Sequence, residues 1–394
     1  MNLRKIKRFI VSSKMFSIEH LFVCLIVWLF IGILSAVSLN LSIFNPVKAV
    51  FKEFSMTDIY YTILRSGGDV TWSDDIVIVD MTRQHKRSDI AKTVDDIFQC
   101  KPKLLVCDLI FENEGDDLEG NVDLMNALND SLPIVMACKL TDYDEKRTAF
   151  RSCVSSFFSN IGSYQEGYVN LLKGINNGCL REYTVSEKLD SNLVFSLPFL
   201  ASCIYRNVQP IADETNVRNI NYSNLEFPIV PFDSIGSFRS VVKDKVVILG
   251  ANREEADMHI TPVGKKSGVE VIAYSLHTSL SQYKISEMST LTSFILSFLL
   301  CFLSAWVGYL ILKHFPKMYL YWLEGYYLFI SIVLIWLGFL LFVKFNYNMH
   351  LVWPFLGLAL VEQARLHYKW LIAFGKSHPK IRWWNKLAKK SIYE

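Results

Sequence analysis

The sequence predicts an α/β fold in which a parallel-sheet, Rossmann-like domain is inserted between one N-terminal and three C-terminal transmembrane helices. Three observations predict it: long apolar runs near both ends, an alternation of strand and helix patterns between them, and charges that separate by region. The chain has 394 residues, of which 51% are hydrophobic, and its mean hydropathy of +0.25 is high for a soluble protein.

Four apolar runs are each long enough for the ~20 residues that a spanning helix needs. They cover residues 21–44, 291–312, 319–345 and 351–372. Basic segments flank the runs at both ends, at residues 1–20 and 373–394. Residues 45–288, between the first and second runs, are soluble in character. The chain is therefore predicted to cross a membrane four times.

The first run has an alternative interpretation as a cleaved signal peptide, because Ala36-Val37-Ser38 resembles a cleavage site. The run continues past Ser38 through Leu39 and Leu41, which favours an uncleaved anchor. Both interpretations place the following domain outside the cytoplasm.

The charges support this topology. Residues 45–288 contain 25 Lys and Arg against 34 Asp and Glu, whereas the rest of the chain contains 16 against 4. Basic residues precede the first run, lie at Lys313 and Lys317 between the second and third, and follow the fourth. By the positive-inside rule these places are cytoplasmic, and the acidic domain lies outside.

Strand and helix patterns alternate from residue 75 onward. "IVIVD" (76–80), "LLVCD" (104–108) and "PIVMAC" (133–138) are apolar runs typical of strands covered on both faces. Between them, one helix capped by Ser88 presents Ile90, Val94, Ile97 and Phe98, and another presents Leu118, Val122, Met125 and Leu128. Further on, "VVILG" (246–250) predicts a strand, and Gly268 begins a helix that presents Val269, Ile272, Leu276 and Leu280. This alternation predicts a parallel sheet with right-handed crossovers.

The candidate ligand-binding residues are Asp80, Asp108, Asp257 and Thr261. Asp80 and Asp108 end predicted strands, and Asp257 and Thr261 lie in the loop that follows Gly250. Ligands of open parallel sheets bind at the carboxyl ends of the strands, where these carboxylates would accept hydrogen bonds or bind a cation. The alternative is that each aspartate caps the next helix or ties down its own loop.

Nothing in the sequence indicates an enzyme, a metal or a cofactor. His259 has no second histidine or cysteine at ligand spacing, and no phosphate-binding loop or nucleophile motif occurs. We therefore expect no catalysis, no metal site and no cofactor.

The eight cysteines fall into two groups. Cys24 and Cys301 lie in the apolar runs, and Cys100, Cys107, Cys138 and Cys203 lie in apolar patterns typical of buried thiols. Cys153 and Cys179 lie in more polar surroundings, so they are the candidates for a disulfide.

Ionisable residues near the membrane have structural interpretations. The tail residues Arg382, Trp383, Trp384, Lys386, Lys389 and Lys390 suit an interface with anionic membrane lipid better than nucleic acid. Glu324 and Glu362 are the carboxylates of the spans, and we expect them to face headgroups or to pair with Arg365 or Lys317.

The domain resembles the CHASE2 family of bacterial sensory extracellular domains. The likeness covers "DDIVIVDM" (74–81), "KPKLLVCDLIF" (101–111), "GYVNLLKGINNGCLRE" (167–182) and "KDKVVILGANREEADMHITPVGKKSGVEVIA" (243–273). The chain departs from the family pattern at "TRQHKRSD" (82–89), so the roles of Arg83 and Arg87 are unassigned. Family members usually continue into a cyclase, kinase or phosphatase domain, whereas we expect no such output domain after the fourth run here.

The resemblance implies a multi-pass protein of the bacterial inner membrane whose periplasmic domain binds an unknown ligand. It also implies that the signal passes to a separate partner protein, with self-association left open. The alternative is a structural or assembly scaffold that holds another envelope protein. Ligand-dependent stabilisation would favour the sensor, and a constant stoichiometric envelope partner would favour the scaffold.

Overall fold

The computed structural model describes residues 14–40, 55–68, 70–82, 86–129, 132–159, 164–170, 178–211, 216–253, 255–378 and 391–392. Two compact units make up the chain. One comprises residues 57–284, and the other combines residues 1–56 with residues 285–394. Each unit is described by itself.

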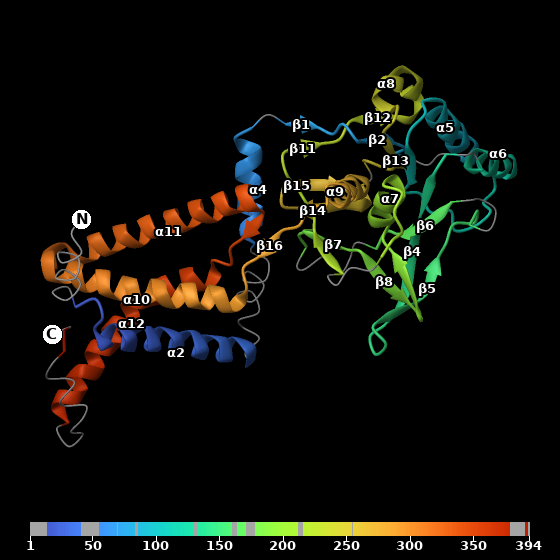
Figure 1. The fold of residues 1–394 in the computed structure, drawn as a ribbon. Helices are drawn as coiled ribbons and strands as arrows, with labels where there is room; N and C mark the ends of the chain where they lie inside the picture. Colours follow the sequence, from blue (N-terminus) through green and yellow to red (C-terminus); the bar gives the residue numbers. More distant parts are fainter. Residues whose placement is uncertain are drawn as a thin grey trace. The chain divides into compact units, whose positions relative to one another are not determined.

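The unit of residues 57–284 is built on a nine-stranded mixed sheet (Figure 1). Its path runs β12-β2-β13-β3-β4-β5-β8-β9, and β6 also pairs with β4. The strands of the unit are β1 (Thr71–Trp72), β2 (Ile76–Asp80), β3 (Leu104–Cys107), β4 (Ile134–Asp144), β5 (Ala149–Val154), β6 (Gln165–Tyr168), β7 (Glu182–Thr184), β8 (Ser186–Leu189), β9 (Asn192–Phe195), β10 (Val217–Asn219), β11 (Leu225–Glu226), β12 (Ile229–Pro231), β13 (Val246–Gly250), β14 (Met258–Thr261) and β15 (Gly264–Ser267).

The centre of this sheet is parallel, as predicted. Strands β12, β2, β13, β3, β4 and β6 pair in parallel, whereas β5 pairs antiparallel with β4 and β9 antiparallel with β8. β13 lies between β2 and β3, although it follows both of them in the sequence by more than a hundred residues. The apolar runs of these three strands are buried because helices cover both faces.

Helices α5, α6 and η3 cover one face of the sheet, and α7 and α9 pack against the other (Figure 1). The helices of the unit are α4 (Met56–Ser66), α5 (Arg87–Gln99), α6 (Leu118–Leu128), α7 (Leu197–Tyr205), η3 (Phe232–Phe238), α8 (Arg239–Val242), η4 (Glu255–Asp257) and α9 (Gly268–Leu280). The alternate residues Val77, Val79, Val247 and Leu249 of the central strands contribute to one core with the inner faces of α5 and α6.

Two local predictions are wrong. α5 begins at Arg87 with Lys86 at its N-cap, so Ser88 lies inside the first turn and caps nothing. The predicted apolar face of α6 is wrong in part. Leu128 is buried and Met125 packs against the core, as predicted, but Leu118 and Val122 are exposed, and Gly120 and Leu124 are buried in their place. A Cβ at Gly120 would clash with the carboxyl group of Asp117 and the backbone nitrogen of Ser88, so the glycine allows α6 to lie close to the start of α5.

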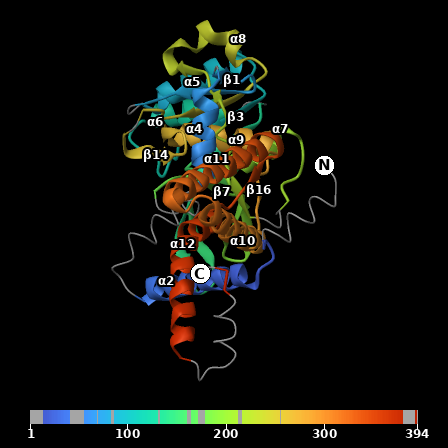
Figure 2. The same cartoon turned by 90° about the vertical axis from the view of Figure 1, so that its left-hand side faces the viewer.

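The other unit is helical (Figures 1 and 2). It contains α2 (Ile18–Asn40), α10 (Thr290–His314), η5 (Pro316–Met318), α11 (Tyr319–Phe345) and α12 (Val352–Ser377), with the short strands β16 (Ser286–Glu287) and β17 (Tyr347–Asn348). Helices α2, α10 and α12 pack against one another, and α11 contacts α10. A Cβ at Gly357 would lie 2.7 Å from both Cys301 Sγ and Ser297 Oγ, so the glycine allows α12 to approach α10 closely.

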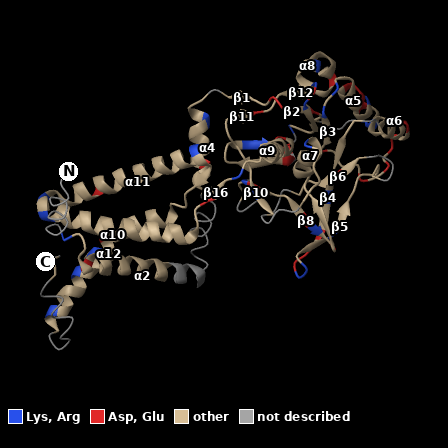
Figure 3. Ribbon diagram, viewed as in Figure 1, with Lys and Arg blue, Asp and Glu red and all other residues tan. Residues whose placement is uncertain are grey.

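Two of the described helices are long and apolar enough to cross a membrane. They are Thr290–His314 and Pro316–Phe345, which include two of the predicted spans, and Ile18–Leu34 is a shorter apolar helix. Figure 3 shows few charged residues along α10 and α11 but several basic ones along α12. In α12, Glu362 forms an ion pair with Arg365, as expected, and also accepts a hydrogen bond of 2.7 Å from the Tyr319 hydroxyl.

Candidate functional site

The ends of three neighbouring strands place two of the predicted aspartates on either side of a glycine. Asp80 at the end of β2 is in register with Gly250 at the end of β13. On the other side, Leu249 is in register with Cys107, so Asp108 directly after β3 lies beside Gly250. The Asp108 backbone N–H donates to Leu249 O at 2.8 Å. We call Asp80, Asp108 and Asp257 the strand-end site.

The side chain of Asp108 leans over Gly250, and Asp257 approaches it from the next loop. A Cβ at Gly250 would lie 3.5 Å from Asp108 Oδ2, and a Cβ at Gly268 would clash with the carboxyl group of Asp257. Gly268 is the first residue of α9, so the absence of a side chain there leaves room for Asp257 at the N-terminus of that helix. Because this end of a helix carries a partial positive charge, it favours a carboxylate.

The two carboxyl groups interact electrostatically. Burial and, to a smaller extent, the nearby Asp257 carboxylate together raise the pKa of Asp108 to about 8. Within the described residues no side-chain hydrogen bond or ion pair involves Asp108, whereas Asp257 contacts His259 Nε2 at 3.2 Å. Asp108 is therefore available to bind a hydrogen-bond donor or a positively charged group.

Asp80 and Thr261 hold local structure. Asp80 Oδ1 accepts hydrogen bonds from the backbone N–H groups of Thr82, at 2.9 Å, and Asn252, at 3.0 Å. The Thr261 hydroxyl donates to Gly264 O at 2.6 Å in the turn between β14 and β15. Asp80 thus performs the loop-tying role that the sequence left as an alternative, and Thr261 stabilises its hairpin.

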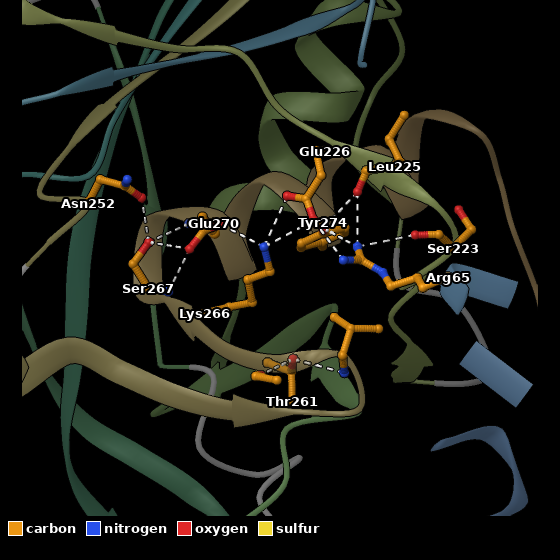
Figure 4. A network of polar contacts seen from close by, with 12 residues as sticks. Arg65, Ser223, Leu225, Glu226, Asn252, Thr261, Lys266, Ser267, Glu270 and Tyr274 are labelled. Atoms are coloured by element: carbon orange, nitrogen blue, oxygen red, sulfur yellow. Dashed lines mark hydrogen bonds and ion pairs between the residues drawn. The ribbon is translucent and has the colours of Figure 1, made fainter. Parts of the chain in front are cut away.

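A polar network that sequence reasoning missed extends from the strand-end site across α9 (Figure 4). Asn252, whose N–H binds Asp80, accepts a hydrogen bond of 2.7 Å from Ser267 Oγ through its side-chain oxygen. Ser267 is the N-cap of α9 and forms a capping box with Glu270. The motif Ser-x-x-Glu at 267–270 was a detectable signal for this cap.

The network continues from Glu270 to α4. Lys266 Nζ lies 3.0 Å from carboxylate oxygens of both Glu270 and Glu226, and Glu226 lies 2.6 Å from Arg65 Nη1. Arg65 Nη2 also donates to the hydroxyl of Tyr274 at 2.6 Å. Burial opposes ionisation of Glu226, but hydrogen bonds from Lys266 and Arg65 hold its pKa below the usual value. The residues come from α4, β11, β15 and α9, so only the tertiary structure joins them.

Arg87 has a structural role in the described chain. Its guanidinium donates to the backbone oxygens of Asn113 and Glu114 and to Asn121 Oδ1, and it lies 5.6 Å from the Phe111 ring centroid. These contacts hold the segment that follows β3. Arg83 and the tail residues 379–390 lie outside the described residues.

The predicted disulfide is absent from the structure, where Cys153 and Cys179 are free thiols. The reason is their placement. Cys153 lies in β5 opposite Leu140 of β4, whereas the backbone of Cys179 pairs with that of Ile260 in β14 as an isolated β-bridge. The prediction that Cys100, Cys107, Cys138 and Cys203 are buried is confirmed. Among the described residues no group of three or more His, Cys, Asp or Glu side chains is arranged to hold a metal ion.

Comparison with known proteins identifies the family. No curated protein and no solved structure matched the chain. A family model described as the CHASE2 domain matches residues 18–310, which cover most of the chain and include the whole strand-end site. The chain therefore belongs to the CHASE2 family of extracellular sensory domains.

Proposed function

We propose that this protein is a sensor of the bacterial inner membrane that binds a ligand through Asp108 and Asp257 on the periplasmic side. The observation that supports this most is the Asp108 carboxyl group, which adjoins a second carboxylate and has no hydrogen-bond or ion-pair partner among the described side chains. A ligand that carries positive charge or several N–H donors would replace the proton that the raised pKa keeps on Asp108 and would stabilise both carboxylates. Divalent cations and small organic amines are therefore the ligand classes to test.

The polar network supplies a route for the signal. Asn252, Ser267 and Lys266 connect the surroundings of Asp80 to Glu226 and Arg65. Arg65 lies in α4, which follows the first apolar helix in the sequence, and α9 precedes α10. A ligand that displaces the N-terminus of α9 would act on both segments that lead to the membrane helices, and a separate partner protein would read the change. We assign no catalytic step to the protein.

The binding test uses the full-length protein in detergent micelles. Its melting temperature is measured with Mg²⁺, Ca²⁺ and a panel of small diamines. We expect one class to stabilise the wild type, Asp108→Asn and Asp257→Asn to abolish the effect, and Asp123→Asn, an exposed aspartate of α6, to retain it. Stabilisation that persists in both site variants would refute binding at this site.

The topology has its own test. We propose four spans, with both termini in the cytoplasm and the CHASE2 domain in the periplasm, because the charges obey the positive-inside rule. Alkaline phosphatase, which is active only outside the cytoplasm, should be active when fused after Lys284 and inactive when fused after Glu394. The reverse pattern would contradict the topology.

The second candidate function is a scaffold for another envelope protein. Exposed apolar side chains such as Trp72, Ile211 and Ile260 in the domain favour it. If the protein is a scaffold, crosslinking in whole cells should yield one constant, stoichiometric periplasmic partner, and no ligand should stabilise the protein. A ligand effect that requires Asp108 would exclude this scaffold as the sole role.

A further inference from the structure

Two cysteines of the periplasmic domain lie together on one face of the sheet. Cys153 of β5 is directly opposite Leu140 of the antiparallel strand β4. Cys138 precedes Leu140 by two residues, so both side chains point to the same face as that of Cys153. Cys138, Leu140 and Cys153 belong to one apolar cluster with Tyr168, which places the two thiols in a common environment.

Among the described strands, β5 is paired on one side only at Cys153. β4 is paired with β6 up to Cys138 and with β5 from Lys139 onward. Cys138 therefore lies at the point of β4 where the paired strand changes from β6 to β5. On its other side β5 pairs with β8 only at Phe150 and Leu189. Diagonal neighbours in an antiparallel pair lie roughly 7–8 Å apart, and a disulfide needs Cα atoms within about 7 Å. A small displacement of the β5 end therefore suffices to join the thiols.

The two thiols differ in accessibility and acidity. Cys138 is buried, with 6% of its surface exposed, whereas Cys153 is partly exposed. A hydrogen bond with Cys138 lowers the pKa of Cys153 to about 7, and the same interaction together with burial raises the pKa of Cys138. Cys153 is thus the thiol that reacts first near neutral pH, because the thiolate is the nucleophile. Burial raises the pKa of Cys179, so that thiol is less reactive.

We propose that Cys138 and Cys153 form a redox-active dithiol that a disulfide oxidant converts into an intrachain bond between β4 and β5. The Cys153 thiolate attacks one sulfur of the oxidant R–S–S–R, forms a mixed disulfide and releases one thiolate RS⁻. Cys138 then loses its proton to solvent and attacks the Cys153 sulfur, which breaks the mixed disulfide and releases the second RS⁻. The two cysteines are oxidised by two electrons in total, and the oxidant is reduced to two thiols. This inference is independent of the proposed ligand.

The test uses the full-length protein in detergent micelles, reduced and then exposed to oxidised glutathione as the probe. Free thiols are alkylated and the peptides are analysed by mass spectrometry without reduction. We expect a peptide pair joined through Cys138 and Cys153 in the wild type and in Cys179→Ser. Cys138→Ala should retain glutathione on Cys153, because the second attack is lost, and Cys153→Ser should leave Cys138 unmodified.

A second measurement uses the wild type alone, so it does not depend on whether a variant folds. The rate at which iodoacetamide alkylates Cys153 in the wild type should rise several-fold between pH 6 and pH 8 and then level off, because its thiolate is by then nearly fully formed. Cys179 should react more slowly than Cys153 at pH 7, and its rate should still be rising at pH 9. A bond between Cys153 and Cys179, glutathione that stays on Cys153 of the wild type, or two free thiols after oxidation would each overturn the proposal.

Discussion

The Asp108 side chain lies directly over Gly250, so that a Cβ atom added to the glycine would stand 3.2 Å from the Asp108 Cβ. The same added atom would stand 3.2 Å from Cγ2 of Val269 in α9. Gly250 therefore sets how closely the end of β3 and the first turn of α9 approach each other. Asp108 can lie over the end of β13 because this strand, which lies between β2 and β3, ends at a glycine and has no side chain there.

Gly250→Ala should destabilise the domain by roughly 1–3 kcal/mol, because overpacking forces Asp108 and Val269 apart. The effect is measured as a fall in the melting temperature of the full-length protein. Gly236→Ala is the matched control, since no atom lies within 4 Å of a Cβ there. Equal melting temperatures for the two variants would contradict the close packing.

The stability of the domain should depend on the protonation of Asp108. Its pKa of about 8 in the folded protein is above the ~3.9 of an unfolded aspartate. The folded state therefore binds the proton more tightly, so the stabilisation is complete below about pH 4 and is lost as the pH rises toward and through 8. Asp108→Asn should remove this part of the pH dependence.

Melting temperatures of the wild type and Asp108→Asn at pH 5 and pH 9 test this expectation. The wild type should lose more stability than the variant across the interval, and Asp123→Asn, which changes an exposed aspartate, should behave as the wild type does. Parallel curves for wild type and Asp108→Asn would show that Asp108 does not titrate in this range.

Gly268→Ala should displace Asp257 from the N-terminus of α9, because the added Cβ would overlap the Asp257 carboxyl group. Helix propensity favours alanine over glycine, so the helix itself should persist. Since the Asp257 charge raises the pKa of Asp108, the pKa of Asp108 should fall in this variant. Carboxyl carbon chemical shifts followed by NMR would measure it, and Asp257→Asn should cause the same change. If the pKa of Asp108 stays unchanged in both variants, the Asp108 and Asp257 carboxyl groups do not interact.

Glu226→Gln should weaken the network that joins α4 to α9. The change removes the ion pairs of Glu226 with Arg65 and Lys266, whose side chains are only 19% and 13% exposed. We expect a loss of roughly 1–3 kcal/mol, as for hydrogen bonds to charged groups. The pKa of Glu226 is lowered in the folded protein, so its contribution exists above its unfolded pKa and disappears as the pH falls through the folded value.

Hydrogen exchange of the α4 amides would detect this change. Exchange in residues 56–66 should accelerate in Glu226→Gln near neutral pH, and the difference from the wild type should shrink in acid. Glu112→Gln, which alters an exposed glutamate outside the network, should leave α4 unchanged. Faster exchange in both variants would indicate a general loss of stability and not a specific role of the network.

The sequence by itself determined the central strands and the α/β alternation. Residues 76–80, 104–107 and 246–250 of the predicted runs are strands in the structure, because an unbroken apolar run is the local signature of a strand covered on both faces. The capping box of Ser267 with Glu270 is encoded just as locally, although we did not predict it. The buried face of α6 was not determined locally, since Leu118 and Val122 are exposed while Gly120 lies close to Asp117. Periodicity reports that a helix is amphipathic, but packing decides which side is covered.

The tertiary structure alone decided which residues meet at the site. Asp108 lies beside Gly250 because β13 inserts between β2 and β3, and no pattern along the chain specifies that insertion. For the same reason Cys153 faces Cys138 across the β4–β5 pairing and not Cys179. Local propensity depends on residues within a few positions of one another, whereas strand order depends on the packing of segments more than a hundred residues apart. The sequence therefore identified the aspartates, and the sheet topology determined which of them approach each other.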